Sequence, residues 1–84
     1  MNRKQQKTLS RIKDKPTCAD LTWDDVQSFF KAIGAKIREG EGSRVQVIFN
    51  KRVLRLHKPH PQKELRKYAV EAIRDFLINI EVIK

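Results

Sequence analysis

The 84-residue sequence contains one cysteine and no long apolar segment. A single cysteine, Cys18, can form neither an intrachain disulfide nor a cysteine-based metal site, so the composition suits a reducing compartment. No segment approaches the roughly 20 apolar residues that a membrane-spanning helix needs, and the basic N-terminus lacks the apolar centre of a signal peptide. We therefore predict a soluble, cytoplasmic protein with no membrane contact.

The whole chain has a formal net charge of +9, and acidic residues are scarce in two parts of it. Residues 1–15 carry six Lys and Arg against one acid, and residues 44–68 carry eight against one. Positive charge that gathers in this way on a small domain is typical of proteins that bind a polyanion, most often nucleic acid. A surface that is basic only for solubility is the alternative.

The length allows one domain with a thin core, because a chain of this size buries only about 60% of its unfolded surface. Residues 1–19 are polar and basic, with Leu9 and Ile12 as their apolar contacts, which predicts a short helix or a mobile arm. Pro16 interrupts helical structure at the residue before it. We expect the folded domain to span residues 20–84.

A first helix is predicted over residues 23–33. Thr22 is a good N-cap residue, and two aspartates in the first turn complement the helix dipole. Gly34 is the type of residue that ends a helix in the left-handed conformation. The spacing i, i+3, i+4, i+7 defines one buried stripe: Val26, Phe29, Phe30 and Ile33. Trp23 could stack on a base, but its position beside this stripe favours core packing.

Alternating apolar and polar residues predict three strands, over residues 35–39, 44–49 and 53–57. Glycines at 40 and 42 favour a turn between the first two strands. Asn50-Lys51 predicts a tight hairpin between the last two, because asparagine tolerates the left-handed region. The resulting antiparallel sheet should have one apolar and one cationic face.

A second helix is expected to start at Pro61 or Gln62, after the proline-rich residues 58–61, and to run to about Leu77. Its apolar stripe comprises Leu65, Ala69, Ala72, Ile73, Phe76 and Leu77. An apolar tail follows, and it should pack on the domain or on a partner because its exposure to water is costly; it comprises Ile78, Ile80, Val82 and Ile83. The order of elements predicts an α+β fold of helix, three-stranded antiparallel sheet and helix.

Together with this order, three short motifs resemble the HicA toxins of bacterial type II toxin–antitoxin systems. They are Gly34 after the first helix, Gly42-Ser43 at the second strand, and Pro59-His60-Pro61 before a lysine-rich helix. The resemblance covers roughly residues 21–80. It implies a double-stranded-RNA-binding-domain-like fold, cleavage of mRNA that arrests translation, and neutralisation by a HicB antitoxin, which we expect to be acidic. A non-catalytic RNA-binding module, or a protein whose basic surface meets only an acidic protein, are the alternatives.

One position departs from the family pattern. The family's catalytic histidine normally follows the Gly-Ser pair directly or after one residue, and Arg44 and Val45 stand there instead. Metal-independent RNA cleavage by 2′-OH attack needs a base, an acid and a cation for the developing charge. Arg44 can supply the cation but is a poor base. His60 and His57 are therefore the predicted acid–base residues, and a structural role for either histidine is the alternative.

The basic stretch also supplies the predicted RNA-binding residues: Ser43, Arg44, Arg55, Lys58 and Lys63. Cations at such positions contact phosphates and 2′-hydroxyls of RNA. His57 and His60 have no cysteine or carboxylate nearby at a spacing typical of metal ligands, and Glu64 is better explained as a first-turn acid of the second helix. The sequence therefore predicts no metal site and no cofactor.

Overall fold

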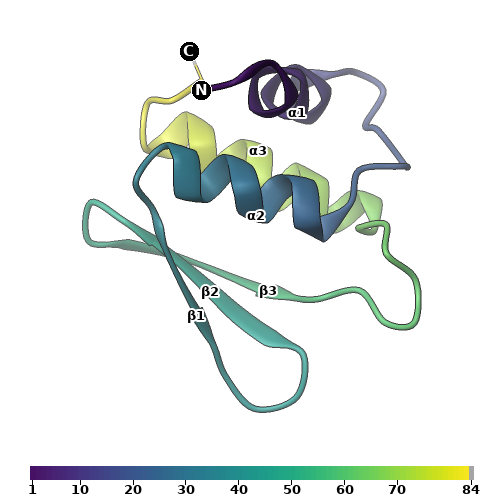
Figure 1. Cartoon of the computed structure of the whole chain (residues 1–84), viewed down its shortest axis with the longest axis vertical. Coiled ribbons are helices and arrows are strands. Elements are labelled where there is room, and N and C mark those ends of the chain that lie inside the picture. Colours follow the sequence, from purple (N-terminus) through teal and green to yellow (C-terminus); the bar gives the residue numbers. More distant parts are fainter. Residues whose placement is uncertain (84) are drawn as a thin grey trace.

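The computed structural model describes residues 1–83 and shows three layers, with α1 on one side, α2 and α3 in the middle, and a sheet on the other side (Figure 1). The elements are α1 (Arg3–Lys13), α2 (Trp23–Ala32), β1 (Lys36–Glu39), β2 (Arg44–Phe49), β3 (Arg52–His57) and α3 (Lys67–Asn79). The predicted α+β class, with a helix, a three-stranded antiparallel sheet and a helix, is confirmed, and a further helix precedes them.

Local sequence determines where α2 begins and ends. The Thr22 hydroxyl accepts a hydrogen bond from the backbone N–H of Asp25 at 3.2 Å, as expected of an N-cap. Gly34 follows the helix with φ +89°, in the left-handed region. The apolar stripe faces the core, where three of its members have no exposed surface: Val26, Phe29 and Phe30.

The sheet has the order β1-β2-β3, and both pairings are antiparallel. Asn50 and Lys51 form the turn between β2 and β3 with φ of 50° and 66°. Two consecutive positive φ values are typical of the type I′ turn, which matches the twist of paired strands. The inner face of the sheet packs on α2 and α3 through buried residues of β2 and β3: Val45, Val47 and Leu56.

The helices leave the other side of the sheet uncovered (Figure 1), and we call it the open face. Its residues alternate with those of the inner face and are paired across the strands: Lys36, Arg38, Arg44, Gln46, Ile48, Val53, Arg55 and His57. Four of these eight are lysine or arginine, so the expected division into an apolar and a cationic face is present.

α3 begins at Lys67, so the predicted start at Pro61 or Gln62 is wrong. The residues before it form a loop instead, with an isolated antiparallel bridge between Glu64 and Thr22. The backbone N–H of Leu65 donates to the carbonyl of Leu21 at 2.8 Å, which pairs this segment with the one before α2. Leu65 enters the core from there, at 3% exposed surface. The long-range pairing therefore overrides the helical spacing of the apolar residues.

The apolar residues after α3 fold back onto the domain. Ile80 and Ile83 are buried, and Val82 packs against the same core. Ile78 lies within α3 and keeps 46% of its surface exposed. Of the two expectations for this tail, packing on the domain is the one that the structure shows.

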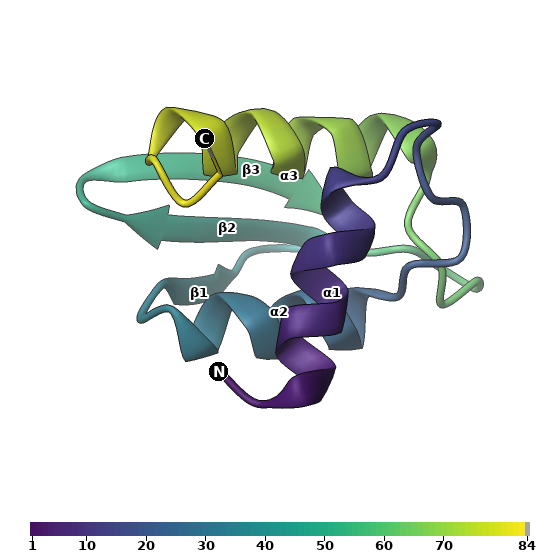
Figure 2. The same cartoon turned by 90° about the horizontal axis from the view of Figure 1, so that it is seen from above.

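The N-terminal segment forms a regular helix, α1, which crosses the outer side of α2 and α3 (Figure 2). Asn2 and Gln5 form a reciprocal capping box at its start. Ile12 is fully buried. Arg74 of α3 donates from its Nε to the carbonyl oxygen of Ile12 at 2.9 Å. The helix is thus attached to α3 by both apolar and polar contacts.

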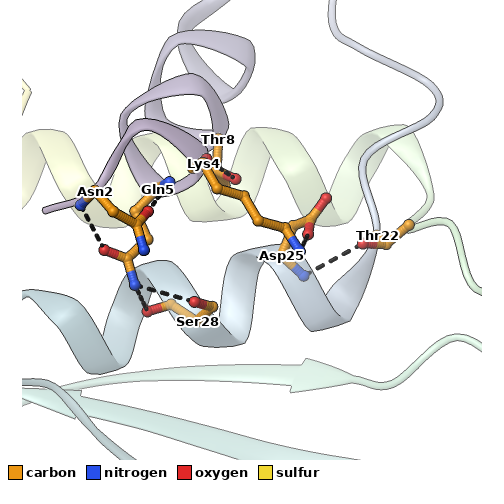
Figure 3. A network of polar contacts seen from close by, with 7 residues as sticks. All are labelled: Asn2, Lys4, Gln5, Thr8, Thr22, Asp25 and Ser28. Carbon is orange, nitrogen blue, oxygen red and sulfur yellow. Dashed lines mark hydrogen bonds and ion pairs between the residues drawn. The ribbon is translucent and has the colours of Figure 1, made fainter.

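Polar contacts also join α1 to α2 (Figure 3). The Gln5 side-chain amide donates to the Ser28 hydroxyl at 3.1 Å. The Lys4 ammonium lies 3.5 Å from a carboxylate oxygen of Asp25. α1 therefore forms a third layer that covers the side of the helices opposite the sheet.

Candidate functional site

A cavity of about 600 Å³ lies where the loop after β3 faces the start of α2. We call it the His60 cavity. Its volume falls within the roughly 300–1,000 Å³ that is typical of sites for small ligands. The lining comes from Trp23, Asp24, Gly42, Ser43 and residues 58–63.

Backbone hydrogen bonds hold the loop at both ends. The N–H of Lys58 donates to the carbonyl of Ser43 at 2.8 Å, which continues the pairing of β2 with β3. The N–H of Trp23 donates to the carbonyl of Lys63 at 3.3 Å. The walls of the cavity are therefore set by main-chain contacts with two other segments of the fold.

Four of the predicted site residues line this cavity: Ser43, Lys58, His60 and Lys63. The last two are exposed, while Ser43 and Lys58 are half-buried. The Lys58 ammonium lies 2.7 Å from a carboxylate oxygen of Glu39 on β1. The hydrogen bond from Lys58 and its positive charge lower the pKa of Glu39. One predicted phosphate-binding cation is thus already paired with an acid inside the protein.

The other predicted residues, Arg44, Arg55 and His57, border a second hollow of about 340 Å³ on the open face, and all three are exposed. Arg44 and His57 are direct cross-strand partners. Cβ atoms in such pairs lie about 4.5–5.5 Å apart. His57 and His60 therefore belong to two different hollows rather than to one.

Ser43 connects the two hollows. Its hydroxyl oxygen lies 3.4 Å from Nδ1 of His57, and the direction of that hydrogen bond depends on the histidine tautomer. The same serine lines the cavity that contains His60. The predicted residues therefore form two adjacent groups with Ser43 between them.

Sequence reasoning did not assign Arg38, Asp24 or Trp23 to this surface. Arg38 pairs with Gln46, which pairs in turn with Arg55, so two arginines flank one glutamine across the open face. The alternation of residues along the predicted strands could have indicated that Arg38 lies on this face. Trp23 is 7% exposed, as core packing predicts, yet it lines the cavity together with Asp24. No local pattern could indicate this, because only folding brings the start of α2 to the loop.

The described residues contain no group of three or more histidine, cysteine or acidic side chains that could hold a metal ion. In the same part of the chain, no helix is long and apolar enough to cross a membrane. Cys18 is a free, half-buried thiol that contacts Arg11 and Asp20.

The fold and this surface define a small α+β domain with a cationic sheet face beside a histidine-containing cavity. The sequence model of one protein family, the HicA toxin of bacterial toxin–antitoxin systems, matches residues 23–81, from the start of α2 to just beyond α3. The chain therefore belongs to the HicA toxin family, and membership implies an antitoxin partner. α1 lies outside the matched residues. No curated protein and no solved structure shows significant similarity to the chain.

Proposed function

We propose that this protein is the toxin of a type II system, that it binds mRNA in the cytoplasm, and that it cleaves the RNA without a metal ion. The proposal rests on the positions of the histidines and arginines around Ser43. One histidine lies 3.4 Å from its hydroxyl and a second lines the same cavity as Ser43. Arg44 and Arg55 are next to the first histidine, and no described residue forms an ion pair with either arginine.

In the proposed reaction a ribose 2′-OH attacks the adjacent phosphate. The O2′–P bond forms and the P–O5′ bond breaks, which leaves a 2′,3′-cyclic phosphate and a 5′-hydroxyl. One group takes the proton of the 2′-OH and another gives a proton to O5′. We assign these two transfers to His60 and His57. Arg44, opposite His57, stabilises the charge of the pentacoordinate phosphate.

We assign RNA binding to cations on both sides of the reacting phosphate. Arg44 and Arg55 contact phosphates along the open face, and Lys63 does so at the His60 cavity. Ser43 adds a hydrogen bond to the backbone of the RNA. Lys58 contributes once a phosphate competes with its carboxylate partner.

The test incubates purified protein with a long single-stranded mRNA, with and without EDTA. We expect fragments that end in a 2′,3′-cyclic phosphate, formed at the same rate in both samples. RNA binding without cleavage above background would favour a second candidate, a non-catalytic RNA-binding module. Arg44 supports that candidate, because the family resemblance leads one to expect a histidine there. Failure to bind RNA at all would contradict both.

We further propose that the antitoxin is a HicB-like acidic protein that covers the open face. Opposite charges across an interface speed association and make it sensitive to salt. Co-expression with the antitoxin should relieve growth arrest caused by the toxin. In purified form, Arg44→Glu/Arg55→Glu should associate with the antitoxin more slowly than the wild type at low salt. Arrest that persists beside abundant soluble antitoxin would contradict this assignment.

A further inference from the structure

One residue of the His60 cavity has no role in binding phosphate. Among the described residues that line the cavity, Asp24 is the only acid, and it stands with Lys58 and Lys63. Its side chain is exposed, and no described residue forms an ion pair with it. A carboxylate repels phosphate and accepts hydrogen bonds. The part of an RNA that fits beside Asp24 is therefore one that carries N–H donors.

Trp23 adds an aromatic side chain to the same lining. Trp23 is a core residue with 7% of its surface exposed, so only a small part of it reaches the cavity, and its backbone N–H donates to the carbonyl of Lys63. Proteins bind unstacked bases of single-stranded RNA by contact with aromatic rings and by hydrogen bonds to the Watson–Crick edge. The accessible part of Trp23 can supply an apolar contact and the free carboxylate of Asp24 a hydrogen-bond acceptor, which are the two parts of such a base site.

The four bases differ in the donors that they can offer to one carboxylate. Guanine presents N1–H and an N2 amino hydrogen side by side, so each carboxylate oxygen can accept one. Adenine and cytosine present one amino group there, and uracil presents one N3–H. Gln62 also lines the cavity, and its amide can donate to the guanine O6 beside those donors. Guanine is thus the base that this set of side chains matches best.

We propose that the His60 cavity binds one unstacked guanine base of a single-stranded RNA, with Asp24 accepting from N1–H and N2–H and Trp23 against the base. The inference rests on the proposed RNA-binding function and adds to it a base preference next to the reacting phosphate. Asp24 also borders a separate hollow along α2 that includes Lys31. Asp24 is therefore tested together with a variant of that second hollow.

Direct binding tests the proposal, because Trp23 is the only tryptophan in the chain and its fluorescence reports on this cavity. The probes are 2′-O-methyl oligouridylates with guanine, inosine, adenine or cytosine at one central position. The methyl group blocks 2′-OH attack, so the probes cannot be cleaved. The guanine probe should quench Trp23 and bind at least about tenfold tighter than the adenine or cytosine probes, as a bidentate pair allows. Inosine, which lacks the N2 amino group, should lose most of that preference.

Asp24→Asn replaces one acceptor oxygen by a donor and should abolish the preference for guanine while binding to phosphate persists. Asp75→Asn on the exposed side of α3 is the matched control, and Lys31→Ala tests the hollow along α2; both should keep the preference. Equal affinity of the wild type for all probes, or a preference for another base, would overturn the proposal. A guanine preference that survives Asp24→Asn would do the same.

These outcomes are separate from those of the proposed function. Cleavage of mRNA with no preference for guanine would overturn the base site and leave the ribonuclease proposal standing. Selective binding of the guanine probe by a protein that does not cleave RNA would support the base site and overturn the ribonuclease proposal. The inosine comparison uses the wild-type chain, so it decides the matter even if Asp24→Asn does not fold.

Discussion

Arg44 and His57 lie directly opposite each other in the pairing of β2 with β3, and both side chains are exposed on the open face. The two-residue turn between these strands fixes that pairing. Under the proposed function, His57 therefore places an imidazole one strand away from the position at which the family resemblance leads one to expect the histidine. Ser43 links this pair to the cavity that contains His60.

Replacement of the histidines tests the assignment of proton transfer. We expect His60→Ala to lower single-turnover cleavage by at least about a hundredfold, because loss of a general acid or base costs 10² to 10⁴ in rate. His57→Ala should also lower the rate. RNA affinity, measured with an uncleavable 2′-O-methyl RNA, should change little in either variant. A double variant that cleaves as the wild type does would show that other groups move the protons.

Salt dependence tests the open face as a phosphate-binding surface. Affinity for single-stranded RNA should fall steeply with salt, with a log–log slope of about 0.7 per neutralised phosphate. Arg44→Ala and Arg55→Ala should each reduce the slope by about that amount. Arg3→Ala, on α1 and on the far side of the helices from the sheet (Figure 1), should leave it unchanged. Anisotropy titrations measure the slope, and a slope near zero would rule out phosphate binding there.

The ion pair between Lys58 and Glu39 predicts that removal of the Glu39 charge strengthens RNA binding. Glu39→Gln should tighten RNA binding at neutral pH, because it frees the Lys58 ammonium and removes a nearby negative charge. Lys58→Ala in the Glu39→Gln background should cancel the gain. Binding of the same RNA at fixed salt by these variants checks the effect. Unchanged affinity in Glu39→Gln would mean that Lys58 does not contact the RNA.

The same ion pair makes stability depend on pH. The hydrogen bond from Lys58 and its charge lower the pKa of Glu39 in the folded state. A carboxyl of this kind stabilises the fold above its unfolded pKa of about 4.3, and the contribution disappears as pH falls through the lower folded value. Glu39→Gln should therefore lose less thermal stability than the wild type on acidification from about pH 5 to about pH 3. Parallel losses in the two proteins would contradict this.

The contacts of α1 predict that this helix contributes to stability. Ile12→Ala should lower the free energy of unfolding by about 2–5 kcal/mol, as expected for a buried isoleucine. Lys13→Ala, at an exposed position of the same helix, should stay within about 0.5 kcal/mol of the wild type. Urea unfolding measures both. Equal, small effects would mean that α1 behaves as an arm that leaves the domain readily.

Features with a local signal in the sequence were predictable. The apolar spacing before Gly34 indicates α2, and the residues around Asn50 alternate as paired strands do. Leu65 shows where such signals fail. Its spacing to Ala69 is that of a helical stripe, but its N–H pairs with the carbonyl of Leu21, far away in the sequence. The start of α3 therefore depends on a contact that no local window contains.

For the candidate site, the sequence indicated residue types but not their grouping. Clustered positive charge indicated Arg44, Arg55 and Lys58, since charge is a property of composition. The pairing of Lys58 with Glu39 depends on how β1 lies beside the rest of the sheet. The approach of Asp24 to the loop likewise depends on the packing of α2. Both are consequences of tertiary structure.

The two backbone hydrogen bonds that hold the loop after β3, at Ser43 and at Trp23, also affect how a ligand binds. A loop that becomes ordered only on binding loses conformational entropy in that step, and the affinity decreases accordingly. Here folding has already restricted the loop, so an RNA segment meets preformed walls. Association with the His60 cavity should then be limited by diffusional encounter and orientation, with a rate constant that rises linearly with RNA concentration and shows no slow rearrangement phase.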